Sequence, residues 1–122
     1  MSKILVVDDD VDIVEVLKHA LIHAGFEVLT ATDAEEFRKQ TREEKPDAII
    51  LDILLGSQNG PQIYQELLNE GFDKNVPVIF LSSLAQDTPL THPQAGRTYA
   101  LLSKPVDHHQ LAEELRCLVD TQ

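Results

Sequence analysis

Four short runs of apolar residues constrain the fold of this chain more than any other feature of its sequence. Within each run the apolar residues follow one another almost without a break, which is typical of strands covered on both faces, as in a parallel sheet. A fifth run mixes apolar residues with threonines and predicts a more exposed strand at an edge of the sheet. The four runs are Ile4–Val7, Ala48–Leu51, Val78–Leu81 and Tyr99–Leu102, and the fifth is Glu27–Thr32.

Helical patterns lie between these strands. Each places apolar residues three and four positions apart, and therefore on one face of a helix. Aspartates precede several of the patterns as capping residues, in one case within an Asp-x-x-Glu capping box, and glycines end two of them. The stripes are Ile13–Ala24, the segment around Phe37, Ile63–Leu68 and Leu111–Leu118, with Asp10 or Asp12, Asp33 and Asp107 as caps and Gly25 and Gly71 as stops.

Strand and helix alternate about five times along the chain, the pattern of an α/β fold with helices on both faces of a parallel sheet. Right-handed crossovers and a polar edge strand favour the strand order 2-1-3-4-5. The alternation breaks between Ser83 and Gly96, where a fourth helix belongs. Pro89 and Pro93 each remove a backbone donor there, so we expect a short or distorted element. We predict one doubly wound, flavodoxin-like domain over residues 1–122.

Composition and charge restrict the partners. The chain has 122 residues, which suits one compact domain, and its 10 basic against 21 acidic residues give a net charge of −11. Such a field repels nucleic acid, so we expect no direct binding of DNA or RNA. No apolar run approaches the roughly 20 residues of a membrane span. Cys117 is the only cysteine, which fits a reducing compartment. We expect a cytoplasmic protein without membrane contact.

Reactive side chains follow the ends of four predicted strands. In a doubly wound sheet the ligand site lies beyond these carboxyl ends. Each residue alone is ordinary, because aspartates often cap helices and serines often form turns. Their shared place in the fold is what predicts a site. Asp8 and Asp9 follow the first strand, Asp52 the third and Ser82 the fourth, and Lys104 comes soon after the fifth.

This set of residues predicts a bound cation and phosphoryl transfer. Carboxylates packed together are costly without a cation, and oxygen ligands select a hard ion such as Mg²⁺, or Mn²⁺. Transfer of a phosphoryl group to a carboxylate needs a nucleophile, a metal and donors for the equatorial oxygens. We therefore predict that Asp52 is the phosphoacceptor, that Asp8 and Asp9 hold the metal, and that Ser82 and Lys104 assist the phosphoryl oxygens.

The same residues resemble the receiver domain of two-component response regulators, over essentially the whole chain. The resemblance rests on ILVVDDD, PDAIILD with Gly60 after it, PVIFLSS and SKP, in this order. It implies that Asp9 is a direct metal ligand and that Asp8 acts mainly through metal-bound water. It also implies that Asp52 and the backbone carbonyl of Leu54 complete the protein ligands.

The resemblance implies partners as well. The phosphoryl donor would be a phosphohistidine on a sensor histidine kinase or a histidine phosphotransfer protein, which would dock at the first helix and the loops beside the site. The signal would pass to a downstream protein that the sequence does not identify. Catalysis would be limited to the domain's own phosphorylation and dephosphorylation, without turnover of a separate substrate.

Several residues depart from the family pattern. Gly56 stands where the family usually has proline, four residues after the phosphoacceptor, and predicts a more flexible loop. Ser83 is bulkier than the alanine or glycine usual after the switch hydroxyl, and Leu101 stands where a switch aromatic is usual. Together with Pro89 and Pro93, these departures keep open an alternative function. In it the chain is a phosphorylation-independent interaction module with an atypical face of fourth helix, fifth strand and last helix.

A third interpretation is a metal-dependent phosphohydrolase of the haloacid dehalogenase type. Such enzymes place a second aspartate two residues after the nucleophile as a general acid. This chain has Leu54 at that position. The sequence therefore favours a receiver over a hydrolase.

Overall fold

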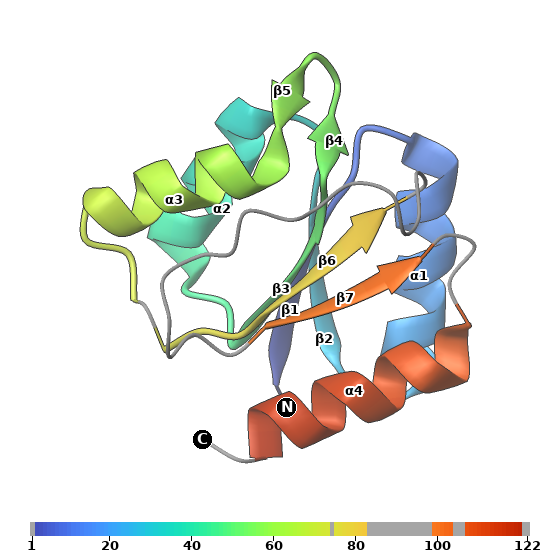
Figure 1. The fold of residues 1–122 in the computed structure, drawn as a ribbon. Helices are drawn as coiled ribbons and strands as arrows, with labels where there is room; N and C mark the ends of the chain where they lie inside the picture. The colour runs from blue at the N-terminus through green and yellow to red at the C-terminus, as the bar shows by residue number, and fades with distance from the viewer. Residues whose placement is uncertain (1, 74, 83–98, 104–106, 121–122) are drawn as a thin grey trace.

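The computed structural model describes residues 2–73, 75–82, 99–103 and 107–120. Five parallel strands form one sheet with helices on both of its faces (Figure 1). The strand order is β2-β1-β3-β6-β7, which is the predicted order 2-1-3-4-5 once two very short strands after β3 are left aside. The strands are β1 Lys3–Val7, β2 Glu27–Ala31, β3 Ala48–Asp52, β6 Val78–Ser82 and β7 Tyr99–Ser103.

Helices α1 and α4 cover one face of the sheet, and α2 and α3 cover the other (Figure 1). None of the helices among the described residues combines the length and apolarity that a membrane span requires. The segment between Ser83 and Gly96, predicted to be short or distorted, lies outside the described residues, so that expectation stays a prediction. The helices are α1 Val11–His23, α2 Ala34–Glu44, α3 Gly60–Asn69 and α4 His108–Asp120.

Side-chain caps begin the four described helices. Asp10, Asp33 and Asp107 each accept hydrogen bonds from backbone N–H groups of the first turn, which confirms the predicted caps. Asn59 does the same for α3, a cap that the sequence did not predict. These oxygens satisfy donors that have no partner within the helix. Gly25 ends α1 as predicted, with a φ of +101° that a side chain rarely adopts.

The central strands divide the core into two layers, because successive residues of a strand point to opposite faces. Leu5 and Val7 pack toward α2 and α3, whereas Ile4 and Val6 pack toward α1 and α4. All four are fully buried. Burial of an aliphatic side chain of this size contributes about 2 kcal/mol. The near-continuous apolar runs are therefore explained by burial on both faces, and β2, with intermediate burial, confirms the predicted edge strand.

A two-stranded hairpin, β4 Leu54–Leu55 and β5 Gln58–Asn59, lies between β3 and α3. Its turn is Gly56–Ser57, and Gly56 has a φ of +63°. Glycine at the first position of a two-residue hairpin turn supplies this conformation without strain. The Gly-Ser pair was the sequence signal for a hairpin here, which the sequence prediction missed. The greater flexibility expected of this loop stays a prediction.

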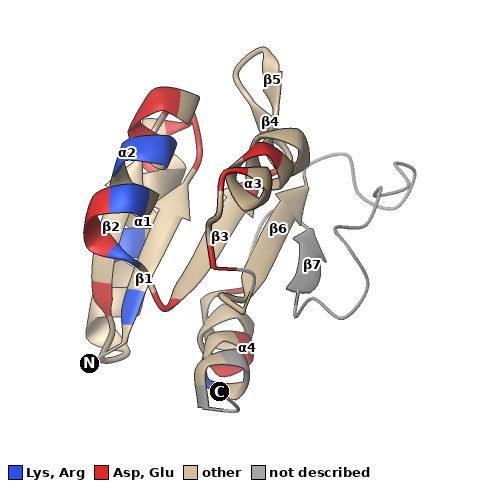
Figure 2. Cartoon of the chain, turned by 90° about the vertical axis from the view of Figure 1, so that its left-hand side faces the viewer, with Lys and Arg blue, Asp and Glu red and all other residues tan. Residues whose placement is uncertain are grey.

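Charged side chains join α2 to α3 on the outside of their layer. α2 carries basic residues that pair with one acidic residue of α3 and with a second at its C-terminal cap (Figure 2). The Arg38 guanidinium contacts Glu66 and also lies 3.4 Å from Glu70. Arg42 reaches Glu70 more loosely, at 3.8 Å. The two helices are thus held together by ion pairs as well as by the buried layer beneath them.

We expect Arg38→Gln to lower the free energy of unfolding by about 1 kcal/mol at low salt, because this guanidinium serves two carboxylates. Its side chain is 25% exposed, whereas that of Arg42 is 66% exposed. The matched control Arg42→Gln is therefore expected to stay within about 0.5 kcal/mol of the wild type. Urea unfolding at low and high NaCl measures both. A loss for Arg38→Gln that does not shrink with salt would contradict the electrostatic explanation.

Candidate active site

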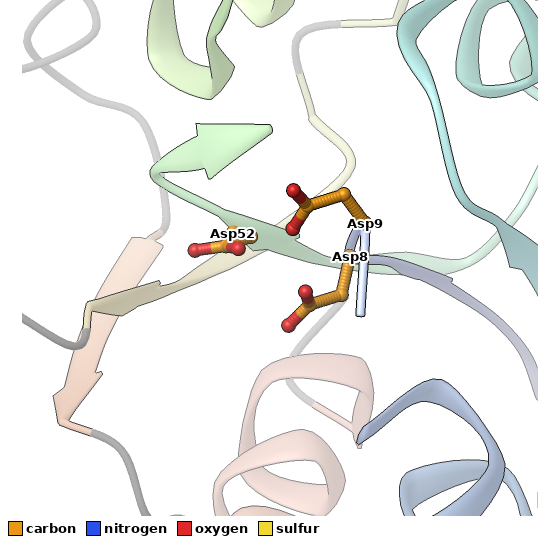
Figure 3. Close-up of side chains that lie close together, drawn as sticks. All are labelled: Asp8, Asp9 and Asp52. Atoms are coloured by element: carbon orange, nitrogen blue, oxygen red, sulfur yellow. The ribbon is translucent and has the colours of Figure 1, made fainter. Parts of the chain in front are cut away.

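Three carboxylates converge at the carboxyl edge of the sheet. β1 and β3 are neighbours in register, with Val7 opposite Leu51, so the residues that follow β1 lie beside the end of β3. Asp8 and Asp9 follow β1, and Asp52 is the last residue of β3. Each offers one ligand oxygen, and these oxygens lie within 4.8 Å of one another. Figure 3 shows the three side chains grouped beyond the strand ends. The predicted cluster is therefore present.

Backbone N–H groups hold each of the three carboxylates. Asp8 is fully buried and Asp52 is 5% exposed, while Asp9 lies at the surface. Hydrogen bonds from the backbone both orient an anion and lower its cost of burial. The bonds run from Asp10 N–H to Asp8 Oδ1 (3.0 Å), from Leu54 N–H to Asp52 Oδ1 (3.3 Å) and from Gly56 N–H to Asp9 Oδ2 (3.1 Å).

The donor set fits a hard divalent cation. Two like charges at this separation repel by about 3 kcal/mol at the effective dielectric of a protein site. A cation between Asp8, Asp9 and Asp52 would reverse this repulsion. Carboxylate oxygens without nitrogen or sulfur ligands suit Mg²⁺ or Mn²⁺. The residues present therefore fit the metal predicted from the sequence.

The other predicted site residues differ in how far the structure places them. Ser82 ends β6, whose residue Leu81 lies opposite Asp52, and Ser82 is 5% exposed. Its strand end therefore lies beside that of the predicted phosphoacceptor. The amide of Leu54 bonds to Asp52, while the predicted use of the Leu54 carbonyl as a metal ligand stays a prediction. Lys104 lies outside the described residues, so its predicted role stays a prediction too.

Two glycines of the site had structural roles that the sequence prediction missed. Gly60, the first residue of α3, packs directly against the backbone of Asp52. A Cβ at this position would lie 2.1 Å from the Asp52 carbonyl oxygen. The Gly60 N–H also donates to the Ile53 carbonyl at 2.7 Å. Glycine at the start of a helix was the available signal. Gly56 is the second glycine, through its hydrogen bond to Asp9.

Known proteins are similar to this chain in sequence. The family model described as response regulator receiver domain matches residues 4–116. The alkaline phosphatase synthesis transcriptional regulatory protein PhoP of Bacillus subtilis is 45% identical over 66 residues, which are 54% of this chain and 28% of that protein. The transcriptional regulatory protein PrrA of Mycobacterium tuberculosis is 41% identical over 81 residues, 66% of this chain and 34% of that protein. The matches thus span about a third of the length of these relatives.

Solved structures agree on the fold. The receiver domain of the Francisella response regulator 1452 superposes with a TM-score of 0.83 at 23% identity, over 99% of this chain and 98% of that chain. The chemotaxis protein CheY4 of Vibrio cholerae gives a TM-score of 0.79 at 27% identity, over 97% of this chain and 98% of that chain. Both likenesses extend over nearly all of the predicted domain.

We expect Gly60→Ala to lower the free energy of unfolding by about 3 kcal/mol, because its methyl group would force α3 away from β3. Gly25→Ala is the control, since its Cβ would meet no heavy atom within 4 Å and only its positive φ resists substitution. The control is expected to cost about 1 to 2 kcal/mol. Chemical denaturation measures both variants. A Gly60→Ala protein as stable as the wild type would contradict the packing role of this glycine.

Proposed function

Because this chain belongs to the response regulator receiver domain family, we propose that it is the phosphoacceptor of a two-component phosphorelay and that Asp52 accepts the phosphoryl group. The single observation that supports this most is the convergence of Asp8, Asp9 and Asp52 from two neighbouring strands. Asp52 is the member of the cluster at the end of a central strand. Asp8 and Asp9 flank it as ligands for Mg²⁺ or Mn²⁺.

The proposed reaction is one displacement at phosphorus. A carboxylate oxygen of Asp52 attacks, a P–O bond forms, and the bond between phosphorus and the imidazole nitrogen of the donor histidine breaks with its electron pair going to that nitrogen. The bound cation would offset negative charge on the equatorial phosphoryl oxygens. The Ser82 hydroxyl and the Lys104 ammonium would donate hydrogen bonds to those oxygens. Hydrolysis of the acyl phosphate would return the carboxylate.

Receiver domains of response regulators are phosphorylated by histidine kinases, and we propose a sensor histidine kinase or a histidine phosphotransfer protein as the donor here. Residues 1–122 would act as one receiver domain in the cytoplasm, and the family match over residues 4–116 supports this extent. The relatives are named as transcriptional regulators. With a net charge of −11, this chain would pass its signal to a downstream protein and would not bind nucleic acid itself.

The alternative is a phosphorylation-independent interaction module. It depended on Ser83, Pro89 and Pro93, which lie outside the described residues, and on Leu101 in β7. In this alternative the carboxylate site persists but binding does not depend on phosphate, so the intact cluster of Asp8, Asp9 and Asp52 is compatible with both functions. Covalent phosphorylation separates the two functions directly.

Incubation with acetyl phosphate and Mg²⁺ is expected to add about 80 Da, the mass of one phosphoryl group, to the wild type. Asp52→Asn is expected to show no adduct, because the amide is a poor nucleophile. Asp33→Asn is the matched control, since asparagine caps α2 as well as aspartate does and Asp33 lies outside the cluster. Intact-mass spectrometry measures all three. An equal adduct on Asp52→Asn would overturn the assignment of Asp52.

Without divalent cations, we expect Asp9→Asn to raise the free energy of unfolding by about 1 kcal/mol, because one of three clustered charges is removed. The asparagine oxygen can still accept from Gly56. With Mg²⁺ the order reverses, because the wild type gains more from cation binding. Thermal unfolding with MgCl₂ or NaCl at equal ionic strength measures the crossing. Asp33→Asn should show no such dependence, and the same order in both salts would count against the metal site.

A further inference from the structure

The tip of the β4–β5 hairpin bonds to one of the proposed metal ligands. Gly56 N–H donates to Asp9 Oδ2 at 3.1 Å, across 47 positions of the sequence. Among the described residues this is the only hydrogen bond that the Asp9 carboxylate makes. Asp9 is also the exposed member of the cluster, whereas Asp8 and Asp52 are buried. Its direction therefore depends on the hairpin more than on surrounding packing.

The conformation and packing of the hairpin direct the Gly56 N–H toward Asp9. Gly56 opens the two-residue turn with a φ of +63°. Next to it, Leu55 is 3% exposed and belongs to the core layer under α2 and α3, which holds the hairpin in place. At the other end, Gly60 N–H closes the loop onto Ile53. The Gly56 N–H thus belongs to a turn that is held by core packing of Leu55 and by the Gly60–Ile53 hydrogen bond.

Proline could not take the place of Gly56 in this arrangement. Proline has no backbone N–H, and its ring holds φ near −65°, opposite in sign to the angle observed here. Proline is the residue usual at this position in the family that the sequence resembles. A chain with proline at this position could therefore not make the hydrogen bond to Asp9, and glycine provides both the N–H and the positive φ.

The bonded geometry is compatible with cation binding. With the Gly56 bond in place, Asp9 still offers a ligand oxygen within 4.8 Å of those of Asp8 and Asp52. A carboxylate has two oxygens, so one can accept from the backbone while the other faces the cluster, as the grouping in Figure 3 allows. Donors that orient a metal ligand in this way typically change metal affinity by about 10- to 100-fold.

We propose that Gly56 is a positioning residue of the cation site, whose backbone N–H holds the Asp9 carboxylate toward Asp8 and Asp52. This inference rests on the cation of the proposed function. Linkage makes the effect reciprocal. If the hydrogen bond from Gly56 to Asp9 strengthens cation binding, then cation binding must strengthen this hydrogen bond by the same free energy. Mg²⁺ therefore stabilises the β4–β5 turn.

The test compares Mg²⁺ affinity in the wild type, Gly56→Pro and Gly56→Ala, by NMR titration with MgCl₂ at constant ionic strength. Gly56→Pro removes the donor and cannot keep the positive φ of the turn, and we expect its dissociation constant for Mg²⁺ to rise about tenfold. Gly56→Ala is the matched control because it keeps the N–H; its Cβ would meet no heavy atom within 4 Å, and only the φ of +63° resists the substitution. We expect its affinity to stay within about threefold of the wild type.

Amide hydrogen exchange in the wild type gives a second readout that needs no mutation. Mg²⁺ is expected to slow exchange at Gly56 more than at Gln62, whose N–H bonds to Asn59 in the same segment but outside the cluster. Unchanged exchange at Gly56 would contradict the coupling. Equal Mg²⁺ affinity in Gly56→Pro, or equal losses in the proline and alanine variants, would overturn the role of the N–H.

These outcomes are distinct from failure of the proposed function. A wild type that binds no Mg²⁺ would remove the metal site, and the inference about Gly56 with it. A wild type that binds Mg²⁺ and is phosphorylated on Asp52, with no effect of Gly56→Pro, would remove only the inference.

Discussion

The parallel pairing of β1 with β3 is the constraint on which the rest of the site depends. Val7 lies opposite Leu51, and this register brings Asp8 and Asp9 beside Asp52. Both strands are buried on both faces, so a slip along the strand would move carboxylates into an apolar layer. The same burial that stabilises the sheet therefore sets the position of the charges at its edge.

The three carboxylates at this edge of the sheet repel one another, and the fold keeps them together. Asp8 and Asp52 are buried beside each other, with Asp9 above them at the surface. Backbone N–H groups stabilise each carboxylate without neutralising it, so the cluster keeps the negative charge that a bound cation would offset. The carboxylates that lower stability by repelling one another are thus the same ones that would bind the cation.

The hairpin links this edge to the layer of α2 and α3. Leu55 anchors β4 in the core, and Gly60 lets α3 begin against the backbone of Asp52. Arg38 then ties α3 to α2 on the outside. Asp52 thus contacts the first residue of α3 directly, and Asp9 is connected to the same layer through Gly56 and its neighbour Leu55. These contacts that connect the site to the helical layer are all made by described residues, and none of them involves the segment between β6 and β7.

The sequence alone determined the α/β class, the strand order, three of the four caps and the residues of the carboxylate cluster. It could do so because apolar runs, capping residues and strand-end position are local patterns with direct physical meaning. Only the tertiary structure decided the Gly56–Ser57 hairpin, the bond from Gly56 to Asp9 and the close approach of Gly60 to Asp52. Two of these are contacts made by backbone atoms, which every residue but proline carries in nearly the same form. Glycine marks both positions in the sequence, but only the packed chain shows which partners their backbone atoms meet.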